Sequence, residues 1–387
     1  MVPLPACGRV TRISAAATTL AVLAVVGAGC ATPGSGIQAG EHVTVYVSVP
    51  LRGPEAVEGR DVVRAAKLAL ADAQGRVGEL AVRAVYLDDT GGRGARARWS
   101  QAVAAANARD AAEDSSAIAY LGDFDSGATR ASLPVINEAR MLQVSPASTA
   151  VDLVQPFLGA GDQVPEEVQP TGERTFGRVI PSDEVQAEAA ARWAKRLGAR
   201  RVGTVSDGSE FGQTMVRAFR QSLQGTTLTR GHGDLVYYGG GPERMPASLT
   251  RSSTGTVMAS DALLMRPPSG PVLGLLVTSA AEDPSQLPRA GERFVSAFTK
   301  RYGRQPGRYA AYGYEAMAVV LDSIRRAGSE GDQRQPVTDA FLATRARRSV
   351  LGTYSIDPLG NTTLDRVSGY RLRPGAQPRA ETLLPAH

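Results

Sequence analysis

The chain has 387 residues, of which 43 are Lys or Arg and 38 are Asp or Glu. This near balance argues against a nucleic-acid partner, and we interpret scattered basic pairs such as Arg347–Arg348 as solvated helix ends. Cys7 and Cys30 are the only cysteines, so a disulfide framework is excluded. A chain of this length exceeds what one hydrophobic core usually serves, and we expect two lobes.

Residues 1–29 are predicted to be an export signal. Arg9 and Arg12 precede an apolar run from 13 to 29, which is too short and too rich in Ala and Gly for a confident membrane span. The letters GAGC, ending at Cys30, resemble the lipobox of bacterial lipoproteins, although Gly27 stands where that motif prefers Leu. An ordinary cleaved signal with an incidental cysteine is the alternative. We expect lipidation at Cys30, with residues 30–40 as a flexible tether.

The next part of the chain is predicted to alternate strands and helices. Such alternation is typical of right-handed βαβ units around a parallel sheet. The Val and Tyr content of the first segment indicates a buried strand. The predicted strands are His42–Pro50 and Leu80–Asp88, and the predicted helices cover about 59–74 and 97–113.

The stretch from Tyr120 to Asp152 is predicted to carry a ligand site. Its predicted elements are a strand at 117–122, a helix at 126–138, a strand at 141–145 and a second helix from about residue 149. Both strand-to-helix turns end in a hydroxyl residue, Ser126 and Thr149. Helix N-termini carry partial positive charge, and open α/β folds bind ligands at the carboxyl edge of their parallel strands. We therefore predict a small-molecule binder that captures an anionic group here.

The same pattern begins again after a Gly-, Pro- and Gln-rich passage at 155–172. The predicted elements are a helix at 182–197 that Ser182 or Asp183 caps, a strand at 201–206, a helix at 210–223 and short strands at 234–238 and 256–260. An apolar strand at 272–279 is expected to cross back to the first lobe. Two similar α/β lobes facing one another would form a cleft between their strand-to-helix turns.

The C-terminal part is predicted to add helices at 288–302, 309–327 and 337–346, followed by turn-rich strand. The second of these helices repeats apolar residues at i, i+3, i+4 and i+7, and Gly328 stands at its C′ position. The repeated residues, which we expect in a core, are Met317, Val320, Leu321 and Ile324.

Several segments resemble the branched-chain amino acid substrate-binding proteins of ABC transporters. They are SVPLRGPEAVEGRDVVRAAKLAL, YLGDFDSGATRASLPVINEARMLQVSPASTAVDL, RTFGRVIPSDEVQAEAAARWAKRLGARRV, DGSEFGQ, DLVYYGG, and YGYEAMAVVLDSIRRAG with LGTYSIDPLGN. The resemblance implies the type I periplasmic-binding-protein fold, an α/β fold in which two doubly wound parallel-sheet lobes, joined by crossing strands, close on a ligand. The expected division is a signal at 1–29, a tether at 30–40, a first lobe at 41–174 and 284–350, and a second lobe at 175–283 and 351–387.

The resemblance also implies ligand-binding residues in the first lobe. Ser126 corresponds to a serine that binds the ligand carboxylate. Ala147, Ser148 and Thr149 correspond to a loop whose backbone and threonine hydroxyl hold the carboxylate and ammonium groups. Each has a structural alternative, because Ser126 and Thr149 could be plain helix caps, and Thr149 with Asp152 matches a capping box.

In the second lobe the resemblance implies two further ligand-binding residues. Phe211 corresponds to an aromatic residue that closes over the ligand, and Asp261 to an acidic residue that pairs with the α-ammonium group. A zwitterion needs donors at one end and a carboxylate at the other, which agrees with this assignment. The alternatives are that Phe211 is a core residue and that Asp261 is a turn residue.

The chain departs from the family's pattern around the side-chain pocket. Glu58 and Gly241 stand where aromatic residues are expected. The passages at 226–234 and 242–256 are shorter than the family's, so the second lobe is predicted to be trimmed. These departures leave open a polar or cationic ligand drawn to Glu58, or a lobe that no longer binds tightly.

No catalytic motif or cofactor motif is present. The chain lacks GxSxG, SxxK, HExxH, CxxC and P-loop patterns, and His42, His232 and His387 are scattered, so we predict no enzyme, no cofactor and no metal site. We expect a monomeric lipoprotein on the outer face of the cell membrane that delivers an amino acid or similar solute to an ABC permease. The alternative is a clamp-fold sensor or interaction lipoprotein that regulates a membrane partner with little or no solute binding.

Overall fold

The computed structural model describes residues 42–386, except for 157–163, 252–254, 266–273 and 374–377. The described residues all belong to one compact unit. The predicted export signal, the tether and Cys30 lie outside the described residues. Among the helices that are described, none is both long and apolar enough to cross a membrane.

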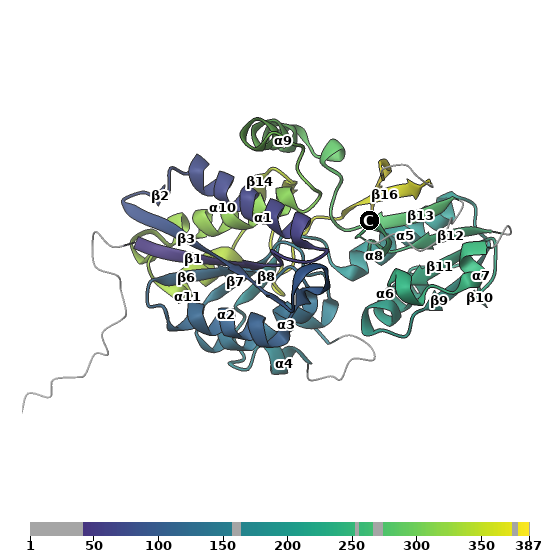
Figure 1. The fold of residues 1–387 in the computed structure, drawn as a ribbon, viewed down its shortest axis with the longest axis horizontal. Coiled ribbons are helices and arrows are strands. Elements are labelled where there is room, and N and C mark those ends of the chain that lie inside the picture. Colours follow the sequence, from purple (N-terminus) through teal and green to yellow (C-terminus); the bar gives the residue numbers. More distant parts are fainter. Residues whose placement is uncertain (1–41, 157–163, 252–254, 266–273, 374–377, 387) are drawn as a thin grey trace, which may run out of the picture. The chain divides into compact units, whose positions relative to one another are not determined.

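The first sheet has six strands in the order β2-β3-β1-β6-β7-β8 (Figure 1). All neighbours are parallel except the β2–β3 pair. Central strand β1 is buried along nearly its whole length, as expected where helices cover both faces. In sheet order the strands are Arg76–Val77 (β2), Leu80–Asp88 (β3), His42–Val49 (β1), Ala117–Leu121 (β6), Leu142–Ser145 (β7) and Phe176–Arg178 (β8).

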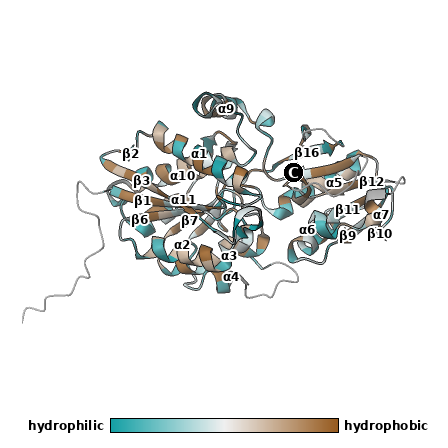
Figure 2. Cartoon of the chain, in the orientation of Figure 1, coloured by the Kyte–Doolittle hydropathy of each residue, from teal (hydrophilic) through white to brown (hydrophobic). Residues whose placement is uncertain are grey.

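Helices pack on both faces of this sheet. One face carries the main core, which joins the valines of β1 to helices α1, α9, α10 and α11. The other face packs against α2 and α3, with short α4 beside α3. Figure 2 shows hydrophobic residues concentrated on these strands and hydrophilic ones on outward helix turns. The helices are Ala56–Asp72 (α1), Gln101–Glu113 (α2), Ser126–Glu138 (α3), Val164–Val168 (α4), Arg289–Tyr302 (α9), Ala310–Ala327 (α10) and Arg334–Leu342 (α11).

The second sheet has seven strands in the order β10-β9-β11-β12-β13-β16-β17. Strands β10, β9, β11, β12 and β13 are parallel to one another, whereas β16 is antiparallel to β13 and β17 is antiparallel to β16. In sheet order they are Thr227–Arg230 (β10), Arg201–Ser206 (β9), Leu235–Gly239 (β11), Thr256–Ala259 (β12), Leu275–Ser279 (β13), Arg366–Leu372 (β16) and Ala380–Pro385 (β17). Helices α5 (Asp183–Arg196) and α6 (Glu210–Gln221) pack on one face, and α7 (Ala247–Arg251) and α8 (Ala262–Met265) on the other.

The second lobe is trimmed where the sequence predicted it. Strands β10 and β11 lie on opposite sides of β9 and are both parallel to it, yet only residues 231–234 connect them. Parallel strands usually need a crossover of a dozen or more residues. The short connection passes directly over Gly203, where a Cβ would lie 2.6 Å from the His232 backbone nitrogen. The absence of a side chain at Gly203 therefore makes this connection possible.

The chain passes between the two sheets in three places. It leaves the first sheet after β8, whereas the expected division placed the passage after residue 174. The apolar segment expected to cross back is instead strand β13 of the second sheet, and Ala280 and Ala281 after it pack in the first core. The third passage precedes β16, because residues up to Leu364 still pack in the first core.

One predicted element is wrong. The second helix expected from about residue 149 is only a single turn of 3-10 helix, Val151–Leu153. Its cap residue, Ala150, has no side chain that can accept a hydrogen bond, so the Thr149–Asp152 capping box does not form. Helices usually end before the residue that precedes a proline, and Pro156 follows closely.

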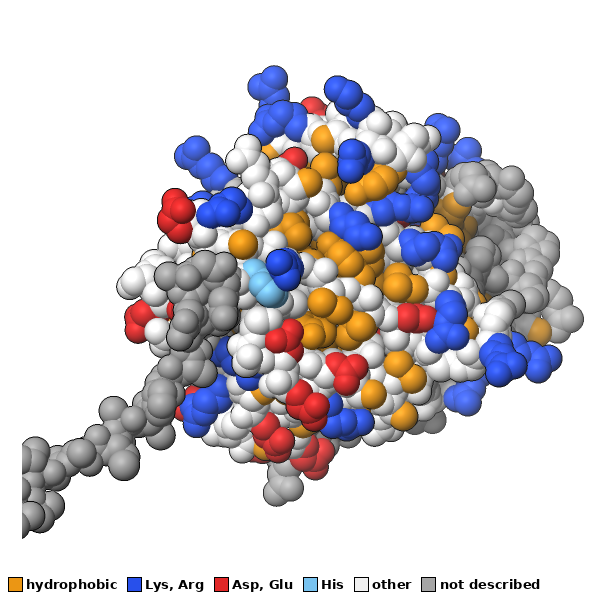
Figure 3. Space-filling view, turned by 60° about the vertical axis from the view of Figure 1, so that its left-hand side comes forward, with side chains coloured by type: hydrophobic (Ala, Val, Ile, Leu, Met, Phe, Trp, Pro, Cys, Tyr) orange, Lys and Arg blue, Asp and Glu red, His pale blue; other side chains and the backbone are white. Residues whose placement is uncertain are grey.

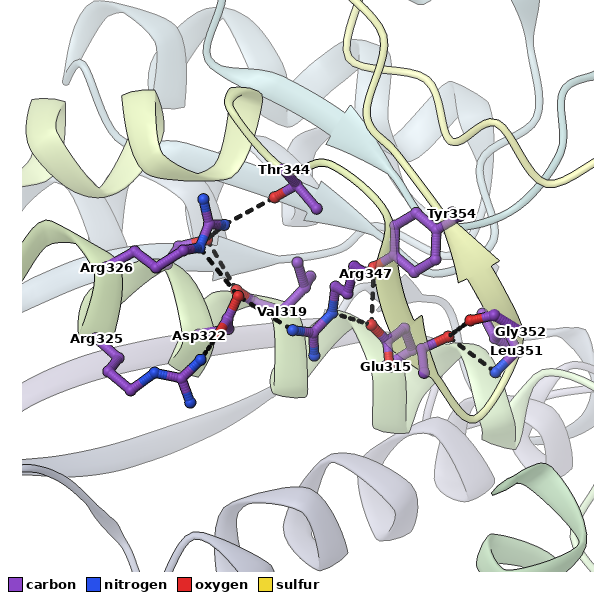
Figure 4. Close-up of polar contacts among 12 residues, drawn as sticks. Glu315, Val319, Asp322, Arg325, Arg326, Thr344, Arg347, Leu351, Gly352 and Tyr354 are labelled. Carbon is purple, nitrogen blue, oxygen red and sulfur yellow. Dashed lines mark hydrogen bonds and ion pairs between the residues drawn. The ribbon is translucent and has the colours of Figure 1, made fainter. Parts of the chain in front are cut away.

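A buried polar network ties α10 to the hairpin of β14 (Arg347–Ser349) and β15 (Gly352–Tyr354) (Figure 4). Arg347 Nε donates to Glu315 Oε1 at 2.6 Å, and the Tyr354 hydroxyl donates to the same oxygen at 2.7 Å. Arg347 also pairs with Asp322 at 3.1 Å. The interpretation of Arg347 as a solvated residue is therefore wrong. On the face in Figure 3, Lys and Arg side chains are spread among acidic and hydrophobic ones.

Candidate functional site

A cavity of about 690 Å³ is lined by residues from both lobes. The first lobe contributes the turn before α3 and the loop after β7. The second lobe contributes the start of α5, the turn into α6, the segment after β11 and the segment around α8. These are carboxyl ends of parallel strands, where α/β folds place their ligands.

Five of the six ligand-binding residues predicted from the sequence line this cavity. Ser148 does not. The residues that line it are Ser126, Ala147, Thr149, Phe211 and Asp261. Gly241, at a position where an aromatic was expected, also lines the cavity, but Glu58 does not. Glu58 is instead directed toward Gly307, where a Cβ would lie 2.4 Å from Glu58 Oε2. A ligand held by Glu58 is therefore not supported.

Ser126 is not the cap of helix α3. Asp125 is the N-cap, and its Oδ1 accepts a hydrogen bond from the Gly127 N–H at 2.7 Å. Ser126 Oγ instead accepts hydrogen bonds from the backbone N–H groups of Thr149 and Ala150, both at 3.2 Å. Ser126 therefore joins the two turns, and its hydroxyl hydrogen remains able to donate.

The loop after β7 is held from behind by buried hydroxyls. Ser145 Oγ accepts from the N–H groups of Ala147 at 3.2 Å and Ser148 at 2.8 Å. Ser148 is fully buried, and its hydroxyl lies 2.7 Å from the Thr129 hydroxyl and donates to the carbonyl of Asp123. Ser148 thus supports the shape of the loop, while Ala147 and Thr149 present its surface to the cavity.

Asp183, which the sequence suggested only as a possible cap of α5, lines the cavity. Ser182 is the N-cap, with its hydroxyl accepting from the Val185 N–H, so the Asp183 side chain is not needed there. Asp183 is 2% exposed, and its Oδ1 has no hydrogen-bond partner among the described residues. Burial raises its pKa to about 7, although the Thr149 hydroxyl stabilises the carboxylate. Ser182 and Asp183 are adjacent, and only one of them can be the N-cap of α5. The sequence therefore indicated that the other side chain would be left for a different role.

Asp261 of the second lobe also lines the cavity. Its Oδ1 is 3.4 Å from Gln186 Nε2, and its Oδ2 is 3.5 Å from the Tyr309 hydroxyl. Both contacts are at the limit of hydrogen bonding. Burial raises the pKa of Asp261, and the positive charge of Arg308 opposes that shift.

Aromatic rings supply much of the apolar wall. Phe124 and Tyr309 meet edge to face with centroids 4.7 Å apart, and both line the cavity. Phe211 lines the second-lobe side of the cavity and also packs against the core of that lobe. Apolar walls with a few placed polar groups are usual in small-molecule sites.

Arg130 of α3 connects the two lobes. One of its terminal nitrogens pairs with Asp152 of the first lobe and, at 3.2 Å, with Glu210 of the second. Its Nε is buried and has no partner among the described residues. The positive charge of Arg130 is therefore already paired with the carboxylates of Asp152 and Glu210.

Acidic residues outnumber basic ones in the described lining of the cavity. The first lobe contributes Glu55, Asp125 and Asp152. The second contributes Asp183, Asp207, Glu210, Glu243 and Asp261. The basic lining residues are Arg130 and Arg217.

Comparison with known proteins identifies the family. The model of the family described as "Periplasmic binding protein" matches residues 42–239. The chain belongs to this family. It is an extracytoplasmic binding protein, and the family is one of substrate-binding proteins rather than enzymes.

Individual relatives are similar over most of the chain. An amino acid binding protein of Pseudomonas aeruginosa is 26% identical over 363 residues, which cover 85% of this chain and 88% of the relative. A leucine binding protein of Thermotoga maritima aligns with a TM-score of 0.69 at 23% identity, covering 89% of this chain and 99% of that one. An ABC transporter solute binding protein of Rhodopseudomonas palustris, in complex with 3,4-dihydroxybenzoic acid, aligns with a TM-score of 0.67 at 16% identity, covering 89% and 98%. The fold is therefore the predicted type I periplasmic-binding-protein fold.

Proposed function

We propose that this chain is a solute-binding protein that captures an amino acid or a similar small polar solute and delivers it to an ABC permease. The proposal includes the division into a signal at 1–29, a tether at 30–40 and two lobes that bind the solute between them. It also includes a lipid anchor at Cys30 that holds a monomer at the outer face of the membrane.

The observation that carries the proposal is the convergence of residues from distant parts of the chain on one cavity. Ser126, Thr149, Phe211 and Asp261, which the sequence and the family resemblance predict as ligand-binding residues, all line that cavity. The relatives support the same class of ligand, since two are described as binding an amino acid or leucine and another was crystallised with an aromatic acid.

The cavity offers a partner for each part of such a solute. The Ser126 hydroxyl can donate to a carboxylate, and Arg130 Nε is a further donor. Phe124, Phe211 and Tyr309 would cover an apolar portion. Asp261 would accept from an ammonium group.

Thermal unfolding of the purified protein across amino acids and related small solutes tests this proposal. A solute that binds only the folded form stabilises it by about 2.7 kcal/mol at a hundredfold excess over Kd. We expect one class of solute to raise the unfolding temperature, and Ser126→Ala or Thr149→Ala to reduce that rise. Ser296→Ala is the matched control, because Ser296 is exposed on α9 outside the cavity lining. No rise with any solute in folded protein would contradict the proposal.

The anchor can be tested separately in cells. Cys30→Ser should move the protein from the membrane fraction to the soluble extracytoplasmic fraction, because no thiol remains for the lipid. An unchanged membrane association would contradict lipidation at Cys30.

A second candidate function is supported by the trimmed lobe. Helices α7 and α8 have five and four residues, and β10 and β11 are joined without a helix. A clamp-fold sensor that regulates a membrane partner would tolerate such a reduction. This candidate would replace the first if no solute raised the unfolding temperature.

A further inference from the structure

The charge of the cavity does not match that of a solute bound mainly through its carboxylate. Of the described residues that line it, eight are acidic and two are basic. Like charges in a site of reduced dielectric repel an anion more strongly than they would in water. An anionic solute would therefore enter an unfavourable field.

The backbone donors expected to capture an anion are already occupied. The N–H groups of Thr149 and Ala150 donate to Ser126 Oγ, and the Gly127 N–H donates to the Asp125 carboxylate. The carboxylate of Asp125 therefore sits at the N-terminus of α3, where an anionic ligand group would have bound. The 3-10 turn after Thr149 does not replace that helix N-terminus.

Asp183 presents a carboxylate oxygen without a partner. Its side chain is buried and lines the cavity, and Oδ1 accepts no hydrogen bond from the described residues. Asp152 Oδ1 is likewise buried and accepts no hydrogen bond from the described residues. A buried carboxylate oxygen without a hydrogen-bond partner is costly, and a bound cation would reduce that cost.

Other charged and titratable groups act on Asp183 from neighbouring elements. The carboxylates of Asp152 and Asp261 disfavour its ionisation, whereas the buried guanidinium of Arg178 favours it. Burial raises the pKa of Tyr237 on β11, and the charges of Asp261 and Asp183 add to that rise. The N–H groups of Arg178 are used elsewhere, because they donate to the Asn361 side chain and to the Ser148 and Ala150 carbonyls. Asp152 is paired with Arg130, and Arg308 acts on Asp261, so the carboxylate oxygens at the cavity that the described residues leave without a partner are Asp183 Oδ1 and Asp152 Oδ1.

Resting on the proposed function, we propose that the solute is an organic cation bearing an ammonium or guanidinium group, and that Asp183 selects for it. The cation lies between the Asp183 and Asp261 carboxylates. The aromatic rings of Phe124, Phe211 and Tyr309 around the same cavity favour a cation through their ring faces. A carboxylate on the solute is optional in this arrangement, because Ser126 and Arg130 Nε can receive one.

Thermal unfolding and isothermal titration at pH 8 test the proposal with defined probes. The cationic probes are L-lysine, L-arginine, agmatine and putrescine, of which the last two lack a carboxylate. The comparison probes are L-leucine, L-glutamate and benzoate. We expect at least one cationic probe to raise the unfolding temperature and to bind at least about tenfold more tightly than any comparison probe.

Substitutions then test whether Asp183 is the residue that selects a cationic solute. Asp183→Asn should weaken binding of the cationic probe about tenfold or more, because a charge-assisted contact becomes a neutral one. Asp125→Asn provides a second test if Asp183→Asn fails to fold, because Asn retains the helix cap and removes the charge. Asp110→Asn, on the exposed side of α2, is the matched control and should change nothing.

The outcomes separate this inference from the proposed function. Tight binding of L-leucine, L-glutamate or benzoate without binding of the cationic probes overturns the inference and leaves a solute-binding protein. Cation binding that is unchanged in both Asp183→Asn and Asp125→Asn also overturns it. No response to any probe contradicts both proposals. Binding of agmatine or putrescine supports the inference and shows that a carboxylate is not required.

Discussion

The two lobes share one architecture but divide its tasks differently. The first lobe has long helices on both faces of its sheet and a large continuous core. The second has long helices on one face and two short ones on the other, and its core is split by the sheet into two smaller clusters. The first lobe supplies the hydroxyls that join the turns, whereas the second supplies five of the eight acids in the described lining.

This difference shows that one lobe of a fold can supply most of the hydrophobic core while the other supplies most of the charged groups that line the cavity. In the first lobe, the buried Glu315 carboxylate is paired with Arg347 and Tyr354. The second leaves Asp183 without a partner for Oδ1 at the cavity. Unpaired buried charge is tolerated where a ligand can compensate for it.

The largest effect is expected from breaking the first lobe's buried network. Glu315→Ala removes the buried carboxylate that both Arg347 and Tyr354 contact. Arg347, which is 16% exposed, then keeps Asp322 as its one ion-pair partner among the described residues. Removing one partner of a buried pair typically costs about 3–5 kcal/mol. We expect that loss in the free energy of unfolding, measured by chemical denaturation. A change below about 1 kcal/mol would show that the network does not hold the hairpin.

A smaller effect is expected from the second lobe's short connection. Gly203→Ala would place a methyl group against the His232 backbone, and overpacking of this kind typically costs about 1–3 kcal/mol. Chemical denaturation should show the loss. A neutral substitution would mean that the connection does not pass so closely over β9.

The pH dependence of stability should distinguish the cavity from the rest of the molecule. Burial raises the pKa of Asp183 to about 7 from an ordinary value of 3.8. Its stabilising contribution is therefore fully present below pH 3.8 and is lost as the pH rises through 7. Asp183→Asn should lessen the fall in unfolding temperature between pH 5 and pH 8. Asp110→Asn should keep the original slope, and an unchanged slope in Asp183→Asn would contradict the assignment.

The smallest effect is expected at the exposed edge of the second sheet. Glu381 pairs with Arg371 at 3.1 Å and with Arg373 at 3.6 Å, and its side chain is 36% exposed. Exposed pairs contribute about 0–1 kcal/mol. Glu381→Ala should therefore change the free energy of unfolding by less than about 1 kcal/mol, which makes it the matched comparison for Glu315→Ala. A loss as large as that of Glu315→Ala would contradict this division.

Much of the fold could be predicted because its signals are local. The helix at 126–138 and the strand at 80–88 were predicted with the boundaries observed, since periodicity and turn residues mark them directly. Met317, Val320, Leu321 and Ile324 are buried in the first core as expected. The prediction of a helix near Thr149 was wrong, because a capping pattern marks where a helix could start but does not show whether the following residues continue it.

The sequence alone determined the element order, the family's fold and five of the residues that line the cavity, because these depend on short-range patterns and matched motifs. Only the tertiary structure decided which side chain caps which helix, that Glu58 does not line the cavity, and that Asp183 does. Those outcomes depend on contacts between residues far apart in the chain, such as Ser126 with Thr149. Hydrogen-bond partners and desolvation arise only when those residues are brought together.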